Sequence, residues 1–411
     1  MTKYPPTVFV LGTDRNIGKT VTCIGIISNL IASGQGLGAQ DIGYIKPVGQ
    51  QTLTVLNDQG RPVECDKDAI VALSLLGIEG PGYEYLSPVV WADGVTSQYI
   101  DEASTGDPLV GRQVFLERIR DAYQHVAQGK RVVLADGTGQ PGVGSVAGIS
   151  NADVIKTLRE MGVPLSVLLV TRGGIGATID QVFPFLVLLD HMGVRTEGLI
   201  INGVFPSKMD KIRRYLTNYY EKAFPVLYGE SLKVHGTPRI VGFVPSVDEL
   251  RCPTMRLIRE TLAKKDEKIV EVVVTKDAEQ GSLSLVRNVK VISLDFGFEA
   301  FLEPGDAVVV GVNSNDVILA ILLLHERMVR QHGQGLSGLI LSCRQVGGLS
   351  RQSEELVSAS DLPTMLVALD SASIVQKIEG MDVKIQPYDV GKKALIAAAF
   401  QDLNLPPGLA L

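Results

Sequence analysis

Cysteine and histidine are scarce in this sequence, and neither is arranged as a metal or disulfide framework. The four cysteines, at positions 23, 65, 252 and 343, lie far apart and form no Cys-x-x-Cys pair. The five histidines show no spacing typical of metal ligands. Zinc sites and disulfide scaffolds need such residues in pairs or at short spacing. We therefore predict neither, and we expect the cysteines to be buried reduced thiols of a cytoplasmic protein.

Long apolar runs and long basic runs are also lacking. The longest apolar segments, such as 318–324, are far shorter than the roughly 20 residues that a membrane helix needs. The opening residues 1–6 lack the apolar core of a signal peptide. The net charge is −6 and no basic cluster occurs, which argues against nucleic acid as the main partner. We predict a cytoplasmic protein with no integral membrane segment and no nucleic-acid partner.

The composition is that of a globular protein with several domains. The 411 residues are 45% hydrophobic and 20% charged, enough for about two or three domains with apolar cores. In the first part, apolar runs without polar alternation are separated by stretches of helical periodicity, which indicates parallel strands buried on both faces. We predict an α/β fold: a parallel, doubly wound P-loop sheet with a second, smaller α/β domain. The expected strands of the first sheet are 7–11, 42–49, 131–139, 164–171, 198–204 and 239–245.

The segment Gly12–Thr20, GTDRNIGKT, lies between an apolar strand and an apolar helix. Strand, glycine-bounded loop, Gly-Lys-Thr and helix is the layout of a phosphate-binding loop. Its glycines let backbone N–H groups converge on a phosphate, and the helix N-terminus adds the positive end of its dipole. Lys19 can reach the outer phosphates, and the Thr20 hydroxyl can bind Mg²⁺. Thr13 stands where the first glycine usually belongs, but the flanking strand and helix favour a phosphate loop over an ordinary turn.

Charged residues also end two other expected strands. Lys46 lies in the end of the second expected strand and Asp136 in the end of the third, and ligands of parallel sheets bind at these carboxyl ends. Lys46 can meet a phosphate or simply be solvated, and Asp136 can face Mg²⁺ or simply form a turn. Asp66 and Asp68 precede an apolar helix, after residues 52–63, which we expect to be a polar excursion. These acids can be helix-start residues only, or one of them can complete a Mg²⁺ site.

Several of these segments together resemble one family, dethiobiotin synthetase. The run Gly12–Thr20 resembles its nucleotide loop, including the displaced first glycine and the Thr-Asp after it. The sequence IKPV around Lys46 resembles its second-strand lysine motif, and Asp68-Ala-Ile looks like its Mg²⁺-binding aspartate at a helix start. Asp136 stands where the family usually has a strand-end glutamate, and Asn202 where it has an adenine-reading asparagine. The resemblance covers about residues 5 to 250.

The resemblance implies a site for ATP and Mg²⁺, in which two lysines stabilise the charge on the transferred phosphoryl group. The implied catalytic residues are Lys19 and Lys46. The implied metal ligands are Thr20, Asp68 and Asp136. The implied nucleotide-binding residues are Gly12, Thr13, Asp14, Asn16, Gly18, Lys19, Thr20 and Asn202.

The remainder of the chain resembles a DRTGG domain, which follows the same P-loop module in the N-terminal region of long bacterial phosphate acetyltransferases. The expected division is a P-loop domain at 1–255, a linker helix at 256–268 and a DRTGG-like α/β domain at 269–411. The naming motif is altered here, with Asn-Ser at 313–314 and Ser-Cys-Arg at 342–344. Because the sequence stops at Leu411, without the transacetylase domain, we do not expect phosphate acetyltransfer. The resemblance favours a homodimer with a protein partner at the second domain.

Other positions depart from the synthetase pattern and leave enzymatic activity open. Arg15 and Asn16 replace a small hydroxyl residue and an acid, and Gln50 replaces a serine near the substrate. Asp14 occupies the place of the signature lysine of related partitioning ATPases. The residues expected to bind phosphate match the family, whereas those expected near the substrate differ. This combination favours a regulatory or assembly factor that binds Mg-ATP. The alternatives are an ATP-dependent ligase acting on an unknown carboxylate or amine, and a partner-binding scaffold with a vestigial nucleotide site.

Overall fold

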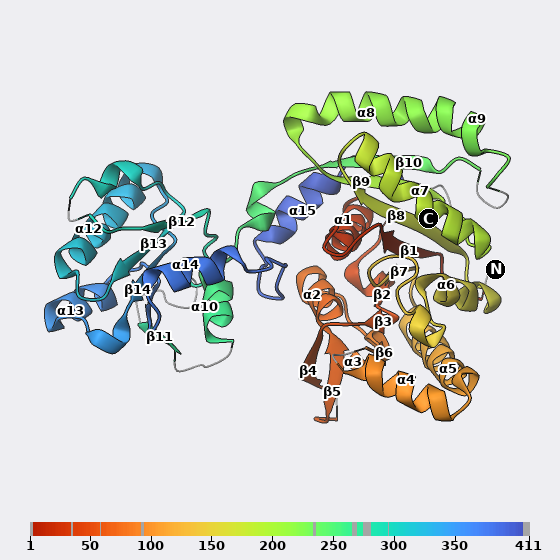
Figure 1. Cartoon of the computed structure of the whole chain (residues 1–411), viewed down its shortest axis with the longest axis horizontal. Coiled ribbons are helices and arrows are strands. Elements are labelled where there is room, and N and C mark those ends of the chain that lie inside the picture. Colours follow the sequence, from red (N-terminus) through yellow and green to blue (C-terminus); the bar gives the residue numbers. More distant parts are fainter. Residues whose placement is uncertain are drawn as a thin grey trace. The chain divides into compact units, whose positions relative to one another are not determined.

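The computed structural model describes residues 3–33, 36–57, 59–91, 94–232, 236–264, 269–273, 281–294 and 296–405. The chain divides into two compact units, both of which are α/β structures (Figure 1). The first unit contains the residues up to Val247 together with those from Gln386 onward, and the second contains Asp248–Ile385. Within the described residues, no helix is long and apolar enough to cross a membrane.

A six-stranded parallel sheet forms the centre of the first unit, in the order β10-β9-β8-β1-β7-β2. Every residue of β1, β2 and β7 is buried, as expected for apolar strands covered on both faces. The predicted parallel, doubly wound sheet is confirmed. Its strands are β1 (Thr7–Gly12), β2 (Ile42–Ile45), β7 (Val132–Asp136), β8 (Leu165–Arg172), β9 (Gly198–Val204) and β10 (Arg239–Pro245).

Helices cover both faces of this sheet (Figure 1). The chain moves along the sheet in one direction from β1 to β2 and in the other from β2 to β10, so right-handed crossovers place α1 opposite α5, α6, α7 and α8. Two further helices, α2 and α15, pack against α1. The bounds are α1 (Lys19–Ala32), α2 (Lys67–Leu76), α3 (Tyr83–Leu86), α4 (Val95–Thr105), α5 (Pro108–Ala127), α6 (Asn151–Glu160), α7 (Gly176–His191), α8 (Met209–Asn218), α9 (Phe224–Tyr228) and α15 (Lys392–Phe400).

Two small sheets lie beside the main one. The strands β3 (Val48–Gly49) and β6 (Val89–Val90) pair in parallel, and β4 (Thr52–Leu56) and β5 (Pro62–Asp66) form an antiparallel hairpin. The expected polar excursion at 52–63 is largely exposed, but the prediction did not include the strand pairing that makes it a hairpin. The segment alternates apolar and polar residues, so that apolar Leu53 faces Cys65 while polar Thr54 faces Glu64 across the hairpin. The hairpin matters because it delivers Asp66 to the start of α2.

The second unit is a five-stranded sheet in the order β11-β15-β14-β13-β12, parallel except for β11. Side chains alternate across β13, so that Val308 and Val310 enter a core with α12, whereas Ala307 and Val309 enter a core with α10 and α14. The bounds are α10 (Met255–Ala263), β11 (Val270–Val273), β12 (Asn288–Val291), β13 (Asp306–Gly311), α12 (Asn315–His332), β14 (Gly338–Ser342), α13 (Arg351–Ala359), β15 (Thr364–Val367) and α14 (Ser371–Glu379).

The observed division of the chain differs from the expected boundaries at 255 and 268. The expected linker helix is α10, which belongs to the core of the second unit; its charged continuation at 265–268 lies outside the described residues. The last described residues belong to the first unit, because α15 packs on α1 and β10. The second unit is therefore an insertion between β10 and α15.

The C-terminal segment completes the first unit through close contacts. The Phe400 ring, 1% exposed, covers Gly25 of α1, where an added Cβ would lie 2.4 Å from Cγ of Phe400. The Asn29 side chain donates a hydrogen bond to the Phe400 carbonyl, and Asn404 N–H donates to the Val241 carbonyl at 2.8 Å. The helix that begins at Lys19 is thus covered by a segment that follows the whole second unit in sequence.

Candidate phosphate-binding site

The loop between β1 and α1 has the backbone of a phosphate-binding loop. Gly18, which caps α1, has φ +89°, and Asn16 has φ +52°, a left-handed conformation that asparagine tolerates better than most residues. At Gly12 an added Cβ would lie 2.7 Å from Cγ2 of Ile17, so the loop closes tightly against the strand end. Thr13, in place of the usual glycine, is 3% exposed, and its N–H donates to the Val170 carbonyl at 2.9 Å.

Lys19 lies at the first position of α1 and folds back over this loop. Its side chain is largely buried, and Nζ donates to the Asp14 carbonyl at 3.3 Å. Burial lowers the pKa of Lys19, although Asp136 nearby opposes that shift. Lys19 thus places its side chain at a helix N-terminus, beside the loop amides, where an anion is favoured.

Asp136, at the end of β7, is the centre of the polar cluster beneath the loop. Its side chain is fully buried, and Oδ2 accepts three hydrogen bonds: from Thr20 Oγ1 at 2.9 Å, from the Tyr44 hydroxyl at 2.9 Å and from Lys46 Nζ at 3.2 Å. The other oxygen, Oδ1, is buried and has no hydrogen-bond partner among the described residues. A buried carboxylate oxygen without a protein donor is costly, and a cation or another donor is the kind of partner that would satisfy it.

Lys46 is 3% exposed and lies among three carboxylates. Nζ is 2.9 Å from Asp68 Oδ2, 3.2 Å from Asp136 Oδ2 and 4.0 Å from Asp66 Oδ1. Burial alone lowers the pKa of Lys46, but Asp136, Asp68 and Asp66 outweigh it and hold the pKa well above its ordinary value. Lys46 is therefore a buried lysine surrounded by carboxylates that favour its charged form, which excludes the solvated strand-end lysine considered from the sequence.

Asp66 fixes the geometry around Lys46 and was considered from the sequence chiefly as a helix-start residue. That role is present, because Oδ1 accepts from Asp68 N–H at 2.9 Å as the cap of α2. Oδ2 also accepts from Gln50 N–H at 2.8 Å and Gln51 N–H at 3.2 Å. Burial raises the pKa of Asp66. Asp66 thereby connects residues 50–51 to the helix that carries Asp68. Asp66 is the last residue of β5, so its position depends on the hairpin that was not predicted.

Two side chains from the ends of β8 and β9 brace the phosphate loop. Asn202 Nδ2 donates to the Ile17 carbonyl at 2.9 Å, next to Gly18. Arg172 donates to the Asn16 carbonyl at 3.3 Å. Asn202 was predicted for this site and lies at the loop. Arg172 was not predicted, although its position at the carboxyl end of a strand next to β1 is a signal that could have identified it.

The structure thus brings together Lys19, Thr20, Lys46, Asp68 and Asp136, although helix α1, the segment after β2, helix α2 and strand β7 supply them from distant parts of the sequence. The described residues contain no group of three or more His, Cys, Asp or Glu arranged to hold a metal on its own. Mg²⁺ commonly takes only one or two carboxylates and completes its shell with water and phosphate oxygens. Thr20 and the open Oδ1 of Asp136 fit such a partial shell.

The strand, the glycine-capped loop and the buried lysines define a phosphate-loop α/β protein. A family model described as an AAA domain (AAA_26) matches residues 6–254, more than half of the chain. The chain belongs to this AAA-domain family.

Several proteins named ATP-dependent dethiobiotin synthetase are similar to part of this chain. The chain is 25% identical over 257 residues to the ATP-dependent dethiobiotin synthetase BioD of Methanocaldococcus jannaschii, covering 61% of this chain and 100% of that protein. It is 26% identical over 199 residues to the BioD of Clostridium kluyveri, covering 47% of this chain and 73% of that protein. The BioD of Clostridium acetobutylicum is 27% identical over 198 residues, covering 47% of this chain and 73% of that protein. The predicted resemblance of the first unit to dethiobiotin synthetase is confirmed.

Proposed function

We propose that the first unit binds Mg-ATP and transfers the outer phosphoryl group to an anionic oxygen, a carboxylate or a carbamate. The observation that carries this proposal is the second lysine. Lys46 is a buried cation held at 2.9 and 3.2 Å from two carboxylates. Burying an ion costs several kcal/mol, and a loop that only binds nucleotide already has Lys19. A second preorganised cation beside the phosphate site is suited to stabilising charge on a phosphoryl group in transfer.

The proposed roles follow from position. The loop Gly12–Gly18 and Lys19 bind the phosphates; Thr20, Asp68 and Asp136 hold Mg²⁺, which supplies charge neutralisation between the phosphates. Asn202 selects the base. Because its Nδ2 donates to the Ile17 carbonyl, Oδ1 is the atom directed to accept from the exocyclic amino group of adenine; guanine offers a carbonyl at that position. The similar synthetases are named as ATP-dependent, which also supports ATP as the nucleotide.

The acceptor substrate need not be that of the relatives. Gln50, the predicted departure near the substrate, is tied by its backbone to Asp66 rather than left in a mobile loop. Its backbone is therefore held beside Asp66, which lies 4.0 Å from Lys46 Nζ. We propose that this chain acts on its own carboxylate or amine substrate, and that Gln50 contributes to selecting it.

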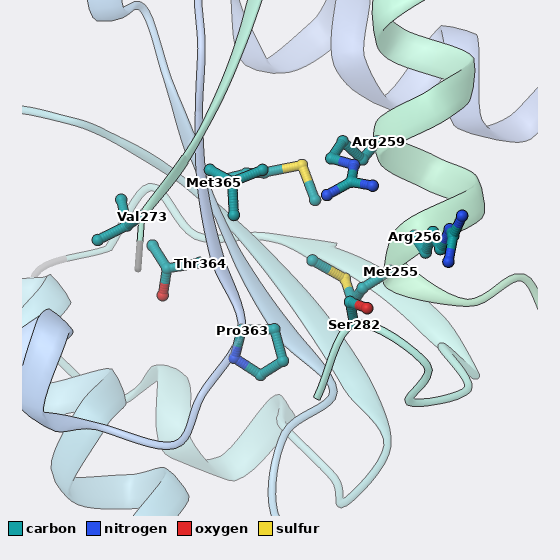
Figure 2. A pocket seen from close by; sticks show the side chains of 9 residues that line it. Met255, Arg256, Arg259, Val273, Ser282, Pro363, Thr364 and Met365 are labelled. Atoms are coloured by element: carbon teal, nitrogen blue, oxygen red, sulfur yellow. The ribbon is translucent and has the colours of Figure 1, made fainter. Parts of the chain in front are cut away.

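A second candidate is a regulatory or assembly factor in which the second unit, resembling a DRTGG domain, binds a ligand, a partner or a second copy. The specific observation is a pocket in that unit between α10 and strands β11 and β15 (Figure 2). Met255, Arg259 and Met365 point into it, and Arg256 at its border pairs with Glu260 at 3.0 Å. A pocket with arginines and methionines suits a small ligand with an anionic group and an apolar part.

The test is calorimetric titration with ATP in the presence and absence of Mg²⁺, comparing wild type with Lys19→Ala and with Lys156→Ala. Lys156 is an exposed lysine on α6 and is the control for loss of one charge. We expect Mg²⁺-dependent binding that Lys19→Ala weakens at least 100-fold and Lys156→Ala leaves unchanged, because Lys19 lies at the phosphate loop and Lys156 does not. ATP should bind more tightly than GTP.

The two candidates separate on turnover. A synthetase hydrolyses little ATP alone and releases phosphate when its carboxylate or amine is supplied, whereas a regulator shows little turnover with every compound in a panel of such substrates. Absence of ATP and GTP binding to the wild-type protein contradicts both candidates and leaves a scaffold with a vestigial site.

A further inference from the structure

Tyr44 is a buried residue of the site that neither the sequence motifs nor the proposed roles employ. It lies in β2, is 1% exposed, and its hydroxyl donates to Asp136 Oδ2 at 2.9 Å. The strand β2 pairs in parallel with β7, which ends at Asp136, so both side chains project from neighbouring strands of the central sheet. Such strands move little relative to each other, and the phenol therefore reaches the carboxylate from a fixed origin.

We propose that Tyr44 is a positioning residue: its hydroxyl holds the Asp136 carboxylate so that Oδ1 is presented to the Mg²⁺ of the proposed function, on which this inference rests. The carboxylate is used asymmetrically. Oδ2 accepts all three hydrogen bonds, from Tyr44, Thr20 and Lys46, while buried Oδ1 has no partner among the described residues.

The three donors are not equivalent. Thr20 is itself a proposed metal ligand, and Lys46 is shared with Asp68 at 2.9 Å and faces the transferred phosphate in the proposed function. When nucleotide and metal bind, both groups acquire new partners. The Tyr44 hydroxyl has Asp136 as its hydrogen-bond partner among the described residues and no second role. It is the donor that keeps Oδ2 engaged, and hence Oδ1 free, in the loaded site.

The competing explanation is that a buried hydroxyl merely needs an acceptor. Tyr123 provides a matched control for this explanation. It is also fully buried in the first unit, and its hydroxyl pairs with the Thr7 hydroxyl at 2.6 Å, away from Asp136. Removing either hydroxyl leaves a similar small void and one lost hydrogen bond, but only Tyr44 touches a proposed metal ligand.

The experiment measures metal binding directly by electron paramagnetic resonance of Mn²⁺, a stand-in for Mg²⁺, with β,γ-methylene-ATP and the full-length protein. We expect Tyr44→Phe to raise the Kd for Mn²⁺ about tenfold, the loss typical when a group that orients a metal ligand is removed. Its affinity for the nucleotide in EDTA should stay within about twofold of wild type. Tyr123→Phe should match wild type in both measurements.

A second variant guards against misfolding or a void at this position. The protein with 4-fluorophenylalanine at position 44 keeps the volume of the hydroxyl but has no proton to donate, and it should bind Mn²⁺ as weakly as Tyr44→Phe. Wild-type affinity in either folded variant, while Asp136→Ala loses the metal, overturns the positioning role and leaves the proposed function standing. Failure of the wild-type protein to bind Mn²⁺ with nucleotide overturns the proposed function and this inference together.

Discussion

A single buried lysine determines the electrostatics of the site. Lys46 offsets the charges of Asp66, Asp68 and Asp136, which would otherwise repel one another at the end of the sheet. Removing one partner from such a cluster is more damaging than replacing all of them, because an uncompensated buried charge remains. The cluster is therefore a unit, and substitutions within it should be interpreted together.

The cysteines differ from one another more than the sequence indicates. All four are free thiols, as predicted, but only Cys23 and Cys65 are buried, while Cys252 and Cys343 are partly exposed. Burial raises the pKa of Cys65 to about 12 and that of Cys23 well above its ordinary value. Expecting all four to be buried is therefore wrong for two, both in the second unit.

This difference predicts selective alkylation. Only the thiolate reacts with alkylating reagents. Because the pKa of Cys65 is about 12, about one Cys65 thiol in ten thousand is ionised at pH 8. We expect iodoacetamide to modify Cys252 and Cys343 in the folded protein, and Cys23 and Cys65 only after unfolding. Peptide mass spectrometry measures each site, and the urea-unfolded protein is the control. Modification of folded Cys65 at the rate of Cys252 would contradict the burial described.

At the scale of elements, the contact between α1 and α15 predicts a strongly coupled pair of substitutions. Phe400→Ala should lower the free energy of unfolding by about 3 kcal/mol through loss of a buried ring. Gly25→Ala should lower it by about 2 kcal/mol, because the new Cβ meets that ring at 2.4 Å. In the Phe400→Ala background the space is open, and Gly25→Ala should become neutral or stabilising by up to about 1 kcal/mol, since alanine favours helix.

Urea unfolding of the two single variants and the double variant gives the coupling energy. Effects that add to within about 0.5 kcal/mol would show that α15 does not cover α1 in solution. Gly311→Ala, in a strand of the second unit where an added Cβ meets only the Ser314 hydroxyl at 3.6 Å, serves as a glycine control without a clash.

The predictability of these elements follows from how local their signals are. The strand, loop and helix around Lys19 are specified by adjacent residues, and so are the apolar strands that carry Lys46 and Asp136. The hairpin before Asp66 was missed because its alternating pattern is short and interrupted by turn residues. The docking of α15 has no local signal at all: Gly25 and Phe400 are complementary only in three dimensions.

The same limits apply to the site. Lys46, Asp68 and Asp136 could be assigned to one sheet edge from strand order and resemblance, and the structure places them together. Which oxygen of Asp136 is free could not be predicted, because it depends on the direction from which Tyr44 and Thr20 approach. The direction from which a donor approaches a carboxylate depends on how the strands pack, and residue type alone does not specify it.

At the scale of the whole molecule, the insertion of Asp248–Ile385 predicts how the chain can be divided. A variant that joins Val247 to Gln386 through a Gly-Ser linker of about 20 residues, spanning roughly 25 Å on average, should fold cooperatively. A fragment ending at residue 255 lacks α15, leaves the Phe400 contact on α1 uncovered, and should be less stable.

Thermal unfolding followed by circular dichroism, with binding of the dye ANS as a measure of exposed apolar surface, compares the two proteins. We expect a sharp transition and low dye binding only for the linked variant. Equal behaviour of the fragment and the linked variant would mean that residues from Gln386 onward are dispensable for the first unit.

The position of α15 also sets an order of events during synthesis. Chains emerge from the ribosome N-terminus first, and domains commonly fold as they appear. Here the strands and the phosphate loop of the first unit emerge early, the second unit follows as a sheet with its own core, and the helix that covers α1 emerges only after it. The nascent protein therefore carries an uncovered apolar helix face throughout translation of the second unit, and its first unit reaches its final form only after the second unit has been made.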